Sequence, residues 1–323
     1  MSWIEKLRLD KLRIGHAGTA SLLFLYGLLS TTSLRTNTPK VLKSPPKTSD
    51  PPYPHDILPN GKDLETPYGR IRYYEFGPEE GKKLLLVHGI STPAPVWSLI
   101  SNQLVKAGYR LLVFDLYGRG YSDTPLVKHD AALFVSQIAL LLAHLPHWHT
   151  FDLAGMSLGG GIVSQFAYYF PDRIDRLLLL CPAGGTPNSQ LGLVRKIIRS
   201  NIVPNWLVRQ LLPYVPLLPT PPKGSLGWWQ KTHHPGYTYS FTSSLQDGPI
   251  FDSHHVHRHV VASFGNRVRA IWGDKDDVVP IDTAKYFGDL DVSVIPGAGH
   301  FAILTHSDQV VGHMLDFLGS PAK

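Results

Sequence analysis

The sequence contains a single cysteine, Cys181, among its 323 residues, and only 17% of its side chains carry a charge. One cysteine cannot form an intramolecular disulfide, so an oxidising compartment is neither required nor excluded. Hydrophobic residues make up 43% of the chain, which excludes wholesale disorder. The length is that of one large domain or two modest ones.

Most of the chain also lacks an excess of positive charge. The formal net charge is +6, but residues 1–50 hold eight basic and three acidic side chains and account for nearly all of it. The remainder is close to neutral, so no nucleic-acid-binding face is expected. The basic N-terminal arm instead indicates an anionic membrane surface or a targeting receptor as its partner.

Residues 14–34 carry no formal charge and are long enough, at 1.5 Å per residue, to cross a hydrocarbon core of about 30 Å. Only residues 22–29 are strongly apolar. Because the uncharged stretch is long enough to span a bilayer, we expect residues 1–35 to be a membrane anchor that enters the membrane through residues 14–34. A cleaved signal peptide, an organelle presequence such as a mitochondrial one, and a soluble packed helix remain alternatives. Basic residues on both sides leave the orientation open, and the sequence does not identify the organelle.

Seven prolines between Pro39 and Pro59 indicate an extended linker over residues 36–59, because proline lacks the amide donor and resists helix formation. The folded domain is expected to comprise residues 60–323.

Beyond residue 60, short apolar runs alternate with helix-length segments. Runs of four or five apolar residues bounded by Gly, Pro or Asp are typical of buried parallel strands. The expected strands are 84–87, 110–114, 151–154, 177–180, 268–272 and 292–295, and the clearest expected helices are 131–145, 158–169 and 307–318. This alternation predicts an α/β fold, a doubly wound and mostly parallel sheet with right-handed crossovers.

The alternation breaks over about residues 183–260. We expect this insertion to form a helical lid after the sixth strand, because long unstructured loops are rare unless functional. Its aromatic side chains are suited equally to an acyl pocket and to packing within the lid: Trp206, Trp228, Trp229, Tyr237, Tyr239 and Phe241.

The strand at 151–154 runs into the sequence Gly155-Met156-Ser157-Leu158-Gly159. A serine between two glycines at a strand-to-helix turn is typical of a nucleophile elbow, in which the glycines avoid Cβ collisions around a strained serine. The spacing also arises by chance, and the alternative is a turn that only packs the helix on the sheet. Its position between a strand and a helix favours Ser157 as a nucleophile.

An acid and a base follow in the order that this fold requires. Asp274, Asp276 and Asp277 come just after the strand at 268–272, and His300 follows the strand at 292–295. Both segments therefore leave the carboxyl edge of the sheet, where α/β proteins build their sites. We assign His300 as the general base and Asp276 as its carboxylate, with Asp277 and then Asp274 as alternatives. A surface or metal-binding role is the alternative for His300.

Acyl transfer also needs donors for a developing oxyanion. The backbone N–H of Leu158, the residue after the nucleophile, is expected to be one of them. The backbone N–H of Ile90, in the loop after the strand at 84–87, is the candidate for the second. His88 precedes a glycine at a strand end, which favours a structural role over a catalytic one.

The segments 86–89, 114–123, 155–160, 272–280 and 297–301 together resemble the motifs of the α/β-hydrolase superfamily, in order and over about residues 65–320. The resemblance implies a serine hydrolase with Ser157, His300 and Asp276 as its triad and no cofactor. It also implies that Asp115 and Arg119 belong to a structural turn outside the catalytic machinery. A shorter likeness, at residues 180–184 and in the N-terminal segment, is to membrane-anchored monoacylglycerol-lipase-like members.

Four histidines at 254, 255, 257 and 259 include pairs spaced for one helix face, which could bind zinc. No nearby carboxylate or cysteine completes such a site, so we expect neither a metal nor a cofactor.

These features favour a serine hydrolase that cleaves a carboxylic ester with an apolar acyl group, such as that of a lipid. A carbon–carbon-bond hydrolase, an amidase and an acyltransferase would use the same triad and remain alternatives. A non-catalytic, membrane-tethered binding module is the alternative from a different class. The oligomeric state is not determined by the sequence.

Overall fold

The computed structural model describes residues 38–50, 52–192, 196 and 221–319. The chain divides into two units, residues 1–39 and residues 40–323. The expected membrane segment at 14–34 lies outside the described residues. Within the described ranges, no helix has both the length and the apolar character needed to cross a bilayer.

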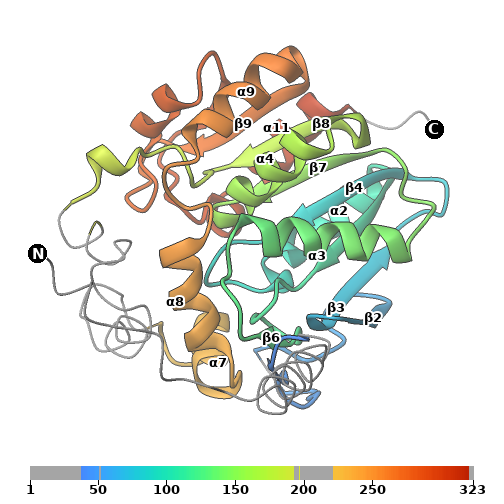
Figure 1. The fold of residues 1–323 in the computed structure, drawn as a ribbon. Helices are drawn as coiled ribbons and strands as arrows, with labels where there is room; N and C mark the ends of the chain where they lie inside the picture. The colour runs from blue at the N-terminus through green and yellow to red at the C-terminus, as the bar shows by residue number, and fades with distance from the viewer. Residues whose placement is uncertain (1–37, 51, 193–195, 197–220, 320–323) are drawn as a thin grey trace, which may run out of the picture. The chain divides into compact units, whose positions relative to one another are not determined.

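Eight strands form one sheet in the order β10-β9-β8-β7-β4-β5-β3-β2 (Figure 1). All neighbouring pairs are parallel except those that β3 makes with β2 and β5. The predicted runs all lie within strands, so the expected doubly wound, mostly parallel fold is confirmed. The strands are β2 (Gly61–Thr66), β3 (Gly69–Phe76), β4 (Lys82–Val87), β5 (Tyr109–Phe114), β7 (Phe151–Met156), β8 (Ile174–Leu180), β9 (Val268–Gly273) and β10 (Asp291–Ile295).

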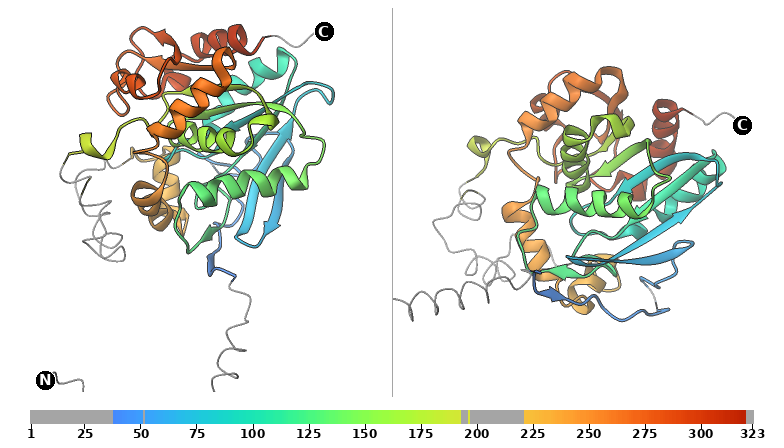
Figure 2. Two further views of the ribbon diagram at one scale, coloured as in Figure 1. Left: turned by 45° about the horizontal axis from the view of Figure 1, so that its top comes forward. Right: turned by 45° about the vertical axis from the view of Figure 1, so that its right-hand side comes forward.

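Helices cover both faces of this sheet (Figure 2). One face packs against α3 (Ala131–His144), α4 (Leu158–Tyr169) and α9 (His254–Phe264), and the other against α2 (Ser98–Lys106), α10 (Ala302–Thr305) and α11 (Ser307–Leu318). Two separate apolar cores result. Short 3₁₀ helices complete the described body: η3 (Ala94–Trp97), η4 (Pro171–Arg173), η5 (Asn188–Gln190), η7 (Gly265–Arg267) and η8 (Ile281–Tyr286).

Strands β2 and β3 were not among the strands expected from the sequence. Charged residues at Arg72 and Glu75 interrupt the apolar pattern of β3, although both are buried. Glu75 stays buried because its carboxylate accepts hydrogen bonds from Trp148 Nε1 at 2.9 Å and Arg110 Nε at 2.9 Å. Buried charges that are paired through later parts of the chain give no local signal.

The proline-rich stretch packs against the domain, which corrects the expected domain start at residue 60. Strand β1 (Val41–Leu42) pairs with β6 (Thr124–Pro125) in a small second sheet. Tyr53 is fully buried, and its hydroxyl donates to Asp115 Oδ2 at 2.8 Å. The prolines prevent helix formation here, but they do not prevent this stretch from packing on the domain. The compact unit therefore includes the stretch and begins at Lys40.

The described part of the insertion contains α7 (Leu226–His233) and α8 (Tyr237–Asp247), which lie beside the 115–125 segment (Figure 1). A Cβ at Gly118, whose φ is +76°, would lie 2.2 Å from Ser240 Cβ, so α8 packs directly on this turn. Trp206 lies outside the described residues. Helix α9 begins before residue 260 but packs on α4, so the end of the expected lid belongs to the helix layer instead.

The histidine-rich stretch forms α9, and its members differ in environment. His255 and His259 are exposed, whereas His257 is buried. His257 Nε2 donates to the Ala183 carbonyl oxygen at 3.1 Å, and Nδ1 lies 3.0 Å from Ser164 Oγ on α4. Burial, aided by the nearby His254 and His255, lowers the pKa of His257 to about 3. His257 therefore serves as a neutral tie between α9 and α4.

A pH-dependent stability difference should follow from this tie. Folding lowers the pKa of His257. The neutral ring therefore contributes its full share to the free energy of unfolding above pH 6.5. This contribution is lost as the pH falls, because the unfolded chain then takes up a proton at His257. The variant His257→Gln should be less stable than the wild type at pH 7.5. The difference in the free energy of unfolding between the wild type and His257→Gln should be smaller by about 2 kcal/mol at pH 5 than at pH 7.5.

Urea unfolding at the two pH values measures that gap. Asp115 and Asp152, whose pKa values burial raises to about 6, titrate in both proteins and cancel in the comparison. A gap that does not change with pH would contradict the neutral, buried state of His257.

Candidate active site

Ser157 occupies the tight turn between β7 and α4. Its φ of 55° and ψ of −119° are strained for a residue with a Cβ, and its N–H donates to the Leu180 carbonyl oxygen at 2.9 Å. The chain turns here only because its neighbours are small. A Cβ at Gly155 would lie 2.3 Å from the Gly159 carbonyl oxygen, and one at Gly159 would lie 2.2 Å from the Val87 carbonyl oxygen.

The structure brings His300 and Asp276 to this serine from two other loops. His300 Nε2 lies 3.0 Å from Ser157 Oγ, and His300 Nδ1 lies 2.8 Å from Asp276 Oδ2. All three side chains are more than nine-tenths buried. The sequence separations between them are 143 and 24 residues, so the sheet, not local chain geometry, assembles the group.

The alternative carboxylates occupy other positions. Asp277 is exposed, and Asp274 is exposed with its Oδ1 accepting the Gly297 N–H at 2.6 Å. Asp276 Oδ1 accepts the N–H groups of Val278 and Val279 at 2.9 and 2.8 Å, which leaves Oδ2 for the histidine. Of the three carboxylates in this turn, Asp276 is the one hydrogen-bonded to His300.

These contacts define the direction of proton transfer. An ionised carboxylate only accepts, so His300 Nδ1 carries the proton that it donates to Asp276. Nε2 is then free to accept the Ser157 hydroxyl proton. The arrangement can raise the nucleophilicity of a hydroxyl and stabilise the imidazolium that forms.

Two backbone amides were predicted to face a developing oxyanion. Leu158 is the first residue of α4, and the first amides of a helix have no intrahelical acceptor. Ile90 lies in the loop that follows β4, the strand beside β7 in the sheet. A Cβ at Gly89 would lie 3.3 Å from Ser157 Cβ, so this loop passes directly beside the serine.

His88 holds that loop, as its predicted structural role requires. The Leu116 N–H donates to His88 Nε2 at 2.9 Å, so the other nitrogen, Nδ1, carries the proton and donates to the Gly89 carbonyl oxygen at 2.8 Å. Burial lowers the pKa of His88 to about 3, which keeps the ring neutral. Because Gly89 C=O and Ile90 N–H share one peptide plane, His88 fixes the direction of the Ile90 amide.

Two further contacts to the loop were missed by sequence reasoning. Arg119, placed in a structural turn by the family resemblance, donates through Nε to the Ile90 carbonyl oxygen at 2.8 Å. Gln230 of α7 donates to the Ser91 carbonyl oxygen at 2.7 Å. Side-chain bonds to a distant backbone leave no spacing pattern, so nothing in the sequence singles out Gln230.

Among the residues that the structure describes, one set of possible metal ligands lies close together. The ligand atoms of Cys181, Asp276 and His300 are within 4.8 Å of one another. Burial raises the pKa of the Cys181 thiol to about 12, which keeps it a protonated thiol beside the other two side chains. His300 and Asp276 are already bonded to each other. The set therefore fits a proton relay better than a metal centre.

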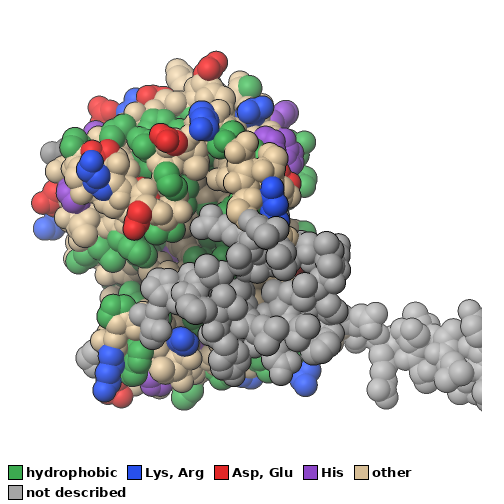
Figure 3. Space-filling view, turned by 90° about the vertical axis from the view of Figure 1, so that its left-hand side faces the viewer, with side chains coloured by type: hydrophobic (Ala, Val, Ile, Leu, Met, Phe, Trp, Pro, Cys, Tyr) green, Lys and Arg blue, Asp and Glu red, His purple; other side chains and the backbone are tan. Residues whose placement is uncertain are grey.

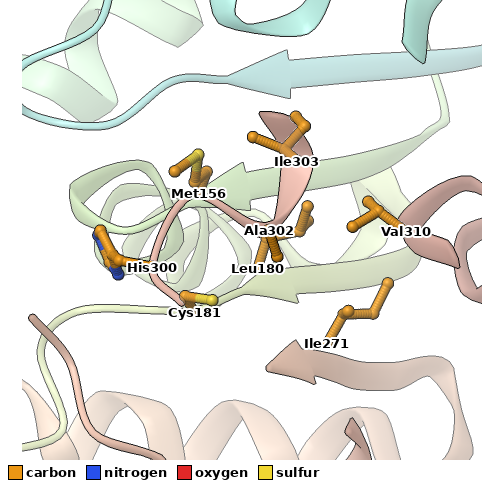
Figure 4. Close-up of a pocket in the computed structure, with 8 residues that line it drawn as sticks. All are labelled: Met156, Leu180, Cys181, Ile271, His300, Ala302, Ile303 and Val310. Carbon is orange, nitrogen blue, oxygen red and sulfur yellow. The ribbon is translucent and has the colours of Figure 1, made fainter. Parts of the chain in front are cut away.

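A small cavity lies behind His300 (Figure 4). Its volume of about 10 Å³ is no larger than one water molecule needs, and its lining is mostly apolar. It is an imperfection in the packing beneath the histidine loop and too small for a substrate. The lining residues are Met156, Leu180, Cys181, Ile271, His300, Ala302, Ile303 and Val310.

The described aromatic residues of the insertion pack α7 and α8 onto the body. The Trp229 ring lies 5.3 Å from that of Tyr53 and 5.4 Å from that of Tyr121. Tyr237 is buried beside Arg119, with 5.7 Å between the guanidinium carbon and the ring centroid. Both residues thus serve the packing of the inserted helices. Basic and acidic side chains are interspersed on the face shown in Figure 3, as expected for a nearly neutral domain.

The elbow geometry makes a direct prediction for stability. Gly159→Ala should destabilise the protein by about 1–3 kcal/mol, because the new Cβ meets the backbone of β4, which cannot move aside cheaply. Gly312→Ala is the matched control, since nothing lies within 4 Å of a Cβ at this position in α11. It should stabilise the helix by about 0.5–1 kcal/mol. Denaturant unfolding measures the change in the free energy of unfolding for both variants. Equal changes would contradict the close approach of α4 to β4 at Gly159.

Comparisons with known proteins agree with this arrangement. Residues 82–216 match a family model described as the alpha/beta hydrolase fold. An uncharacterized protein of Mycobacterium tuberculosis is 32% identical over 131 residues, which is 41% of this chain and 38% of that protein. The match thus spans well under half of that relative's length.

Two other relatives cover more of the chain. A 2-hydroxy-6-oxononadienedioate/2-hydroxy-6-oxononatrienedioate hydrolase of Comamonas testosteroni is 25% identical over 258 residues, 75% of this chain and 89% of that protein. The crystal structure of a bacterial membrane phospholipase A shares the fold with a TM-score of 0.64, at 21% identity over 94% of each chain. Motifs, family model and fold agree: the chain has the α/β-hydrolase fold, and residues 82–216 match the family of that name.

Proposed function

We propose that this hydrolase is a serine hydrolase that cleaves a carboxylic ester with an apolar acyl group. Ser157 is the nucleophile, His300 the general base and acid, and Asp276 the group that orients His300. The backbone N–H groups of Ile90 and Leu158 form the oxyanion hole. The observation that carries the proposal is the pair of hydrogen bonds at 3.0 and 2.8 Å that link the three side chains.

The reaction follows from these contacts. Ser157 Oγ attacks the ester carbonyl carbon while its proton passes to His300 Nε2, and the two amides stabilise the negative oxygen. His300 then gives that proton to the leaving alcohol as the ester C–O bond breaks. Water, deprotonated by His300, then attacks the acyl carbon. The bond to Ser157 Oγ breaks, His300 returns the proton to that oxygen, and the acid leaves.

Apolar residues around the relay support the acyl preference. Phe301 adjoins His300 and Val278 follows Asp276 by two residues, and these side chains are 38% and 56% exposed. Exposed apolar groups beside a reacting centre favour a hydrocarbon chain over a charged one. The proposal includes a lid over residues 183–253 and membrane attachment through residues 14–34, which would bring the enzyme to lipid esters.

A second candidate is carbon–carbon-bond hydrolysis. The Comamonas relative, whose name gives it this class of dienedioate substrate, covers 75% of the chain. The same triad serves both reactions, so the substrate pocket decides between them. The exposed apolar residues near His300 favour the ester.

The test is hydrolysis of p-nitrophenyl esters from acetate to palmitate. Turnover should be highest for medium or long acyl chains, and Ser157→Ala should lower kcat by about 10⁴-fold or more. Ser101→Ala is the control, because this buried serine on α2 bonds the Ser98 carbonyl oxygen on the far layer of the sheet. It should leave kcat unchanged.

A maximum at acetate would contradict the apolar preference. Equal turnover by the wild type and Ser157→Ala would contradict the nucleophile. Turnover of a 2-hydroxy-6-oxo-dienoate, with none of the ester series, would instead identify the carbon–carbon-bond reaction.

A further inference from the structure

Three consecutive carbonyl groups of the loop beside Ser157 each accept a hydrogen bond from a side chain that is fully buried. The carbonyl oxygen of Gly89 is bound by His88, that of Ile90 by Arg119 and that of Ser91 by Gln230, at 2.8, 2.8 and 2.7 Å. His88 belongs to the loop itself. The other two donors lie 29 and 139 residues away from their acceptors in the sequence.

Gln230 has a defined orientation. The N–H of Gly120 donates to Gln230 Oε1 at 3.0 Å, so the amide nitrogen must be the end that faces Ser91. The side chain is 0% exposed, so both bonds are made away from water. Helix α7 is thereby tied at one point to both the Arg119 turn and the loop.

Arg119 makes the equivalent link to α8. Its terminal nitrogens donate to Ser240 Oγ at 2.7 Å and Ser244 Oγ at 3.2 Å, while Nε holds Ile90. These acceptors are uncharged, and the guanidinium is fully buried. A buried cation that has uncharged acceptors loses much by giving up any of them. The positions of α8 and the loop are therefore coupled.

We propose that Arg119 and Gln230 are positioning residues, through which α7 and α8 set the geometry of the oxyanion loop. This inference rests on the proposed function, in which the Ile90 N–H binds the oxyanion. An oxyanion donor acts only when it is held within hydrogen-bond distance of the developing charge. Rotation of the Ile90 or Ser91 peptide would displace that donor, and the two side chains oppose this rotation.

The experiment compares two buried glutamines. Gln230→Met removes the bond to Ser91, whereas Gln137→Met is the control. Gln137 on α3 is equally buried and bonds the Tyr117 N–H and the Asp115 carbonyl oxygen, in the same turn but without contact to the loop. For each variant, kcat and KM are measured with the best ester, together with the inhibition constant of an alkylboronic acid, which forms a tetrahedral adduct on serine.

We expect Gln230→Met to lower kcat about 10-fold, a part of the loss caused by deleting an oxyanion donor. KM should stay within about 2-fold, and boronic acid binding should weaken by the same factor as kcat. Gln137→Met should keep the ratio of boronic acid affinity to KM at the wild-type value. A merely structural role of Gln230 would lower the fraction of active enzyme without changing that ratio.

Equal effects of the two substitutions, or a Gln230→Met effect confined to KM, would overturn the inference. Should Gln230→Met not yield folded protein, Arg119→Lys carries the same test, since it keeps the charge and loses the planar fork. A wild-type protein without Ser157-dependent turnover would instead refute the proposed function. The two failures are therefore distinguishable.

Discussion

The strained turn at Ser157 is the constraint on which the site depends. The turn closes because β7 and β4 are neighbours at the centre of the sheet, and because Gly155 lets α4 approach β7 and Gly159 lets α4 approach β4. The chain continues from β4 to β5 on one side and from β7 to β8 on the other, so the site lies where the strand order reverses. Crevices of this kind are the usual ligand sites of α/β sheets. The position of the serine, the Ile90 loop and the histidine loop thus follows from topology.

A buried polar turn after β5 organises the surroundings of this site. Asp115 accepts the N–H groups of Ala94 and Tyr121 and the hydroxyl of Tyr53, so the proline-rich stretch that contains Tyr53 is joined to it. Arg119 of the same turn joins the Ile90 loop and α8. The turn is outside the reacting group, yet it connects the proline-rich stretch, the inserted helices and the oxyanion loop. A buried polar group in such a network loses much free energy when it gives up a hydrogen-bond partner. The network is therefore rigid.

Much of the fold and of the candidate site could be predicted from the sequence, because parallel strands are apolar runs and the elbow has a fixed spacing. Asp276 could be preferred over Asp277 only through the family pattern, since both follow the same strand. The structure separates them by exposure and by the His300 contact. Strand β3 and the role of Gln230 could not be predicted, because their buried polar groups find partners far along the chain. The packing of residues 40–58 depends likewise on distant partners such as Asp115.

The rate and site of fluorophosphonate labelling, located by peptide mass spectrometry, directly test the relay from Asp276 through His300 to Ser157. We expect one adduct, on Ser157, that forms much more slowly in Asp276→Asn and at the wild-type rate in Asp277→Asn. Labelling of another residue, or equal rates in the two variants, would contradict a relay from Asp276 through His300 to the serine.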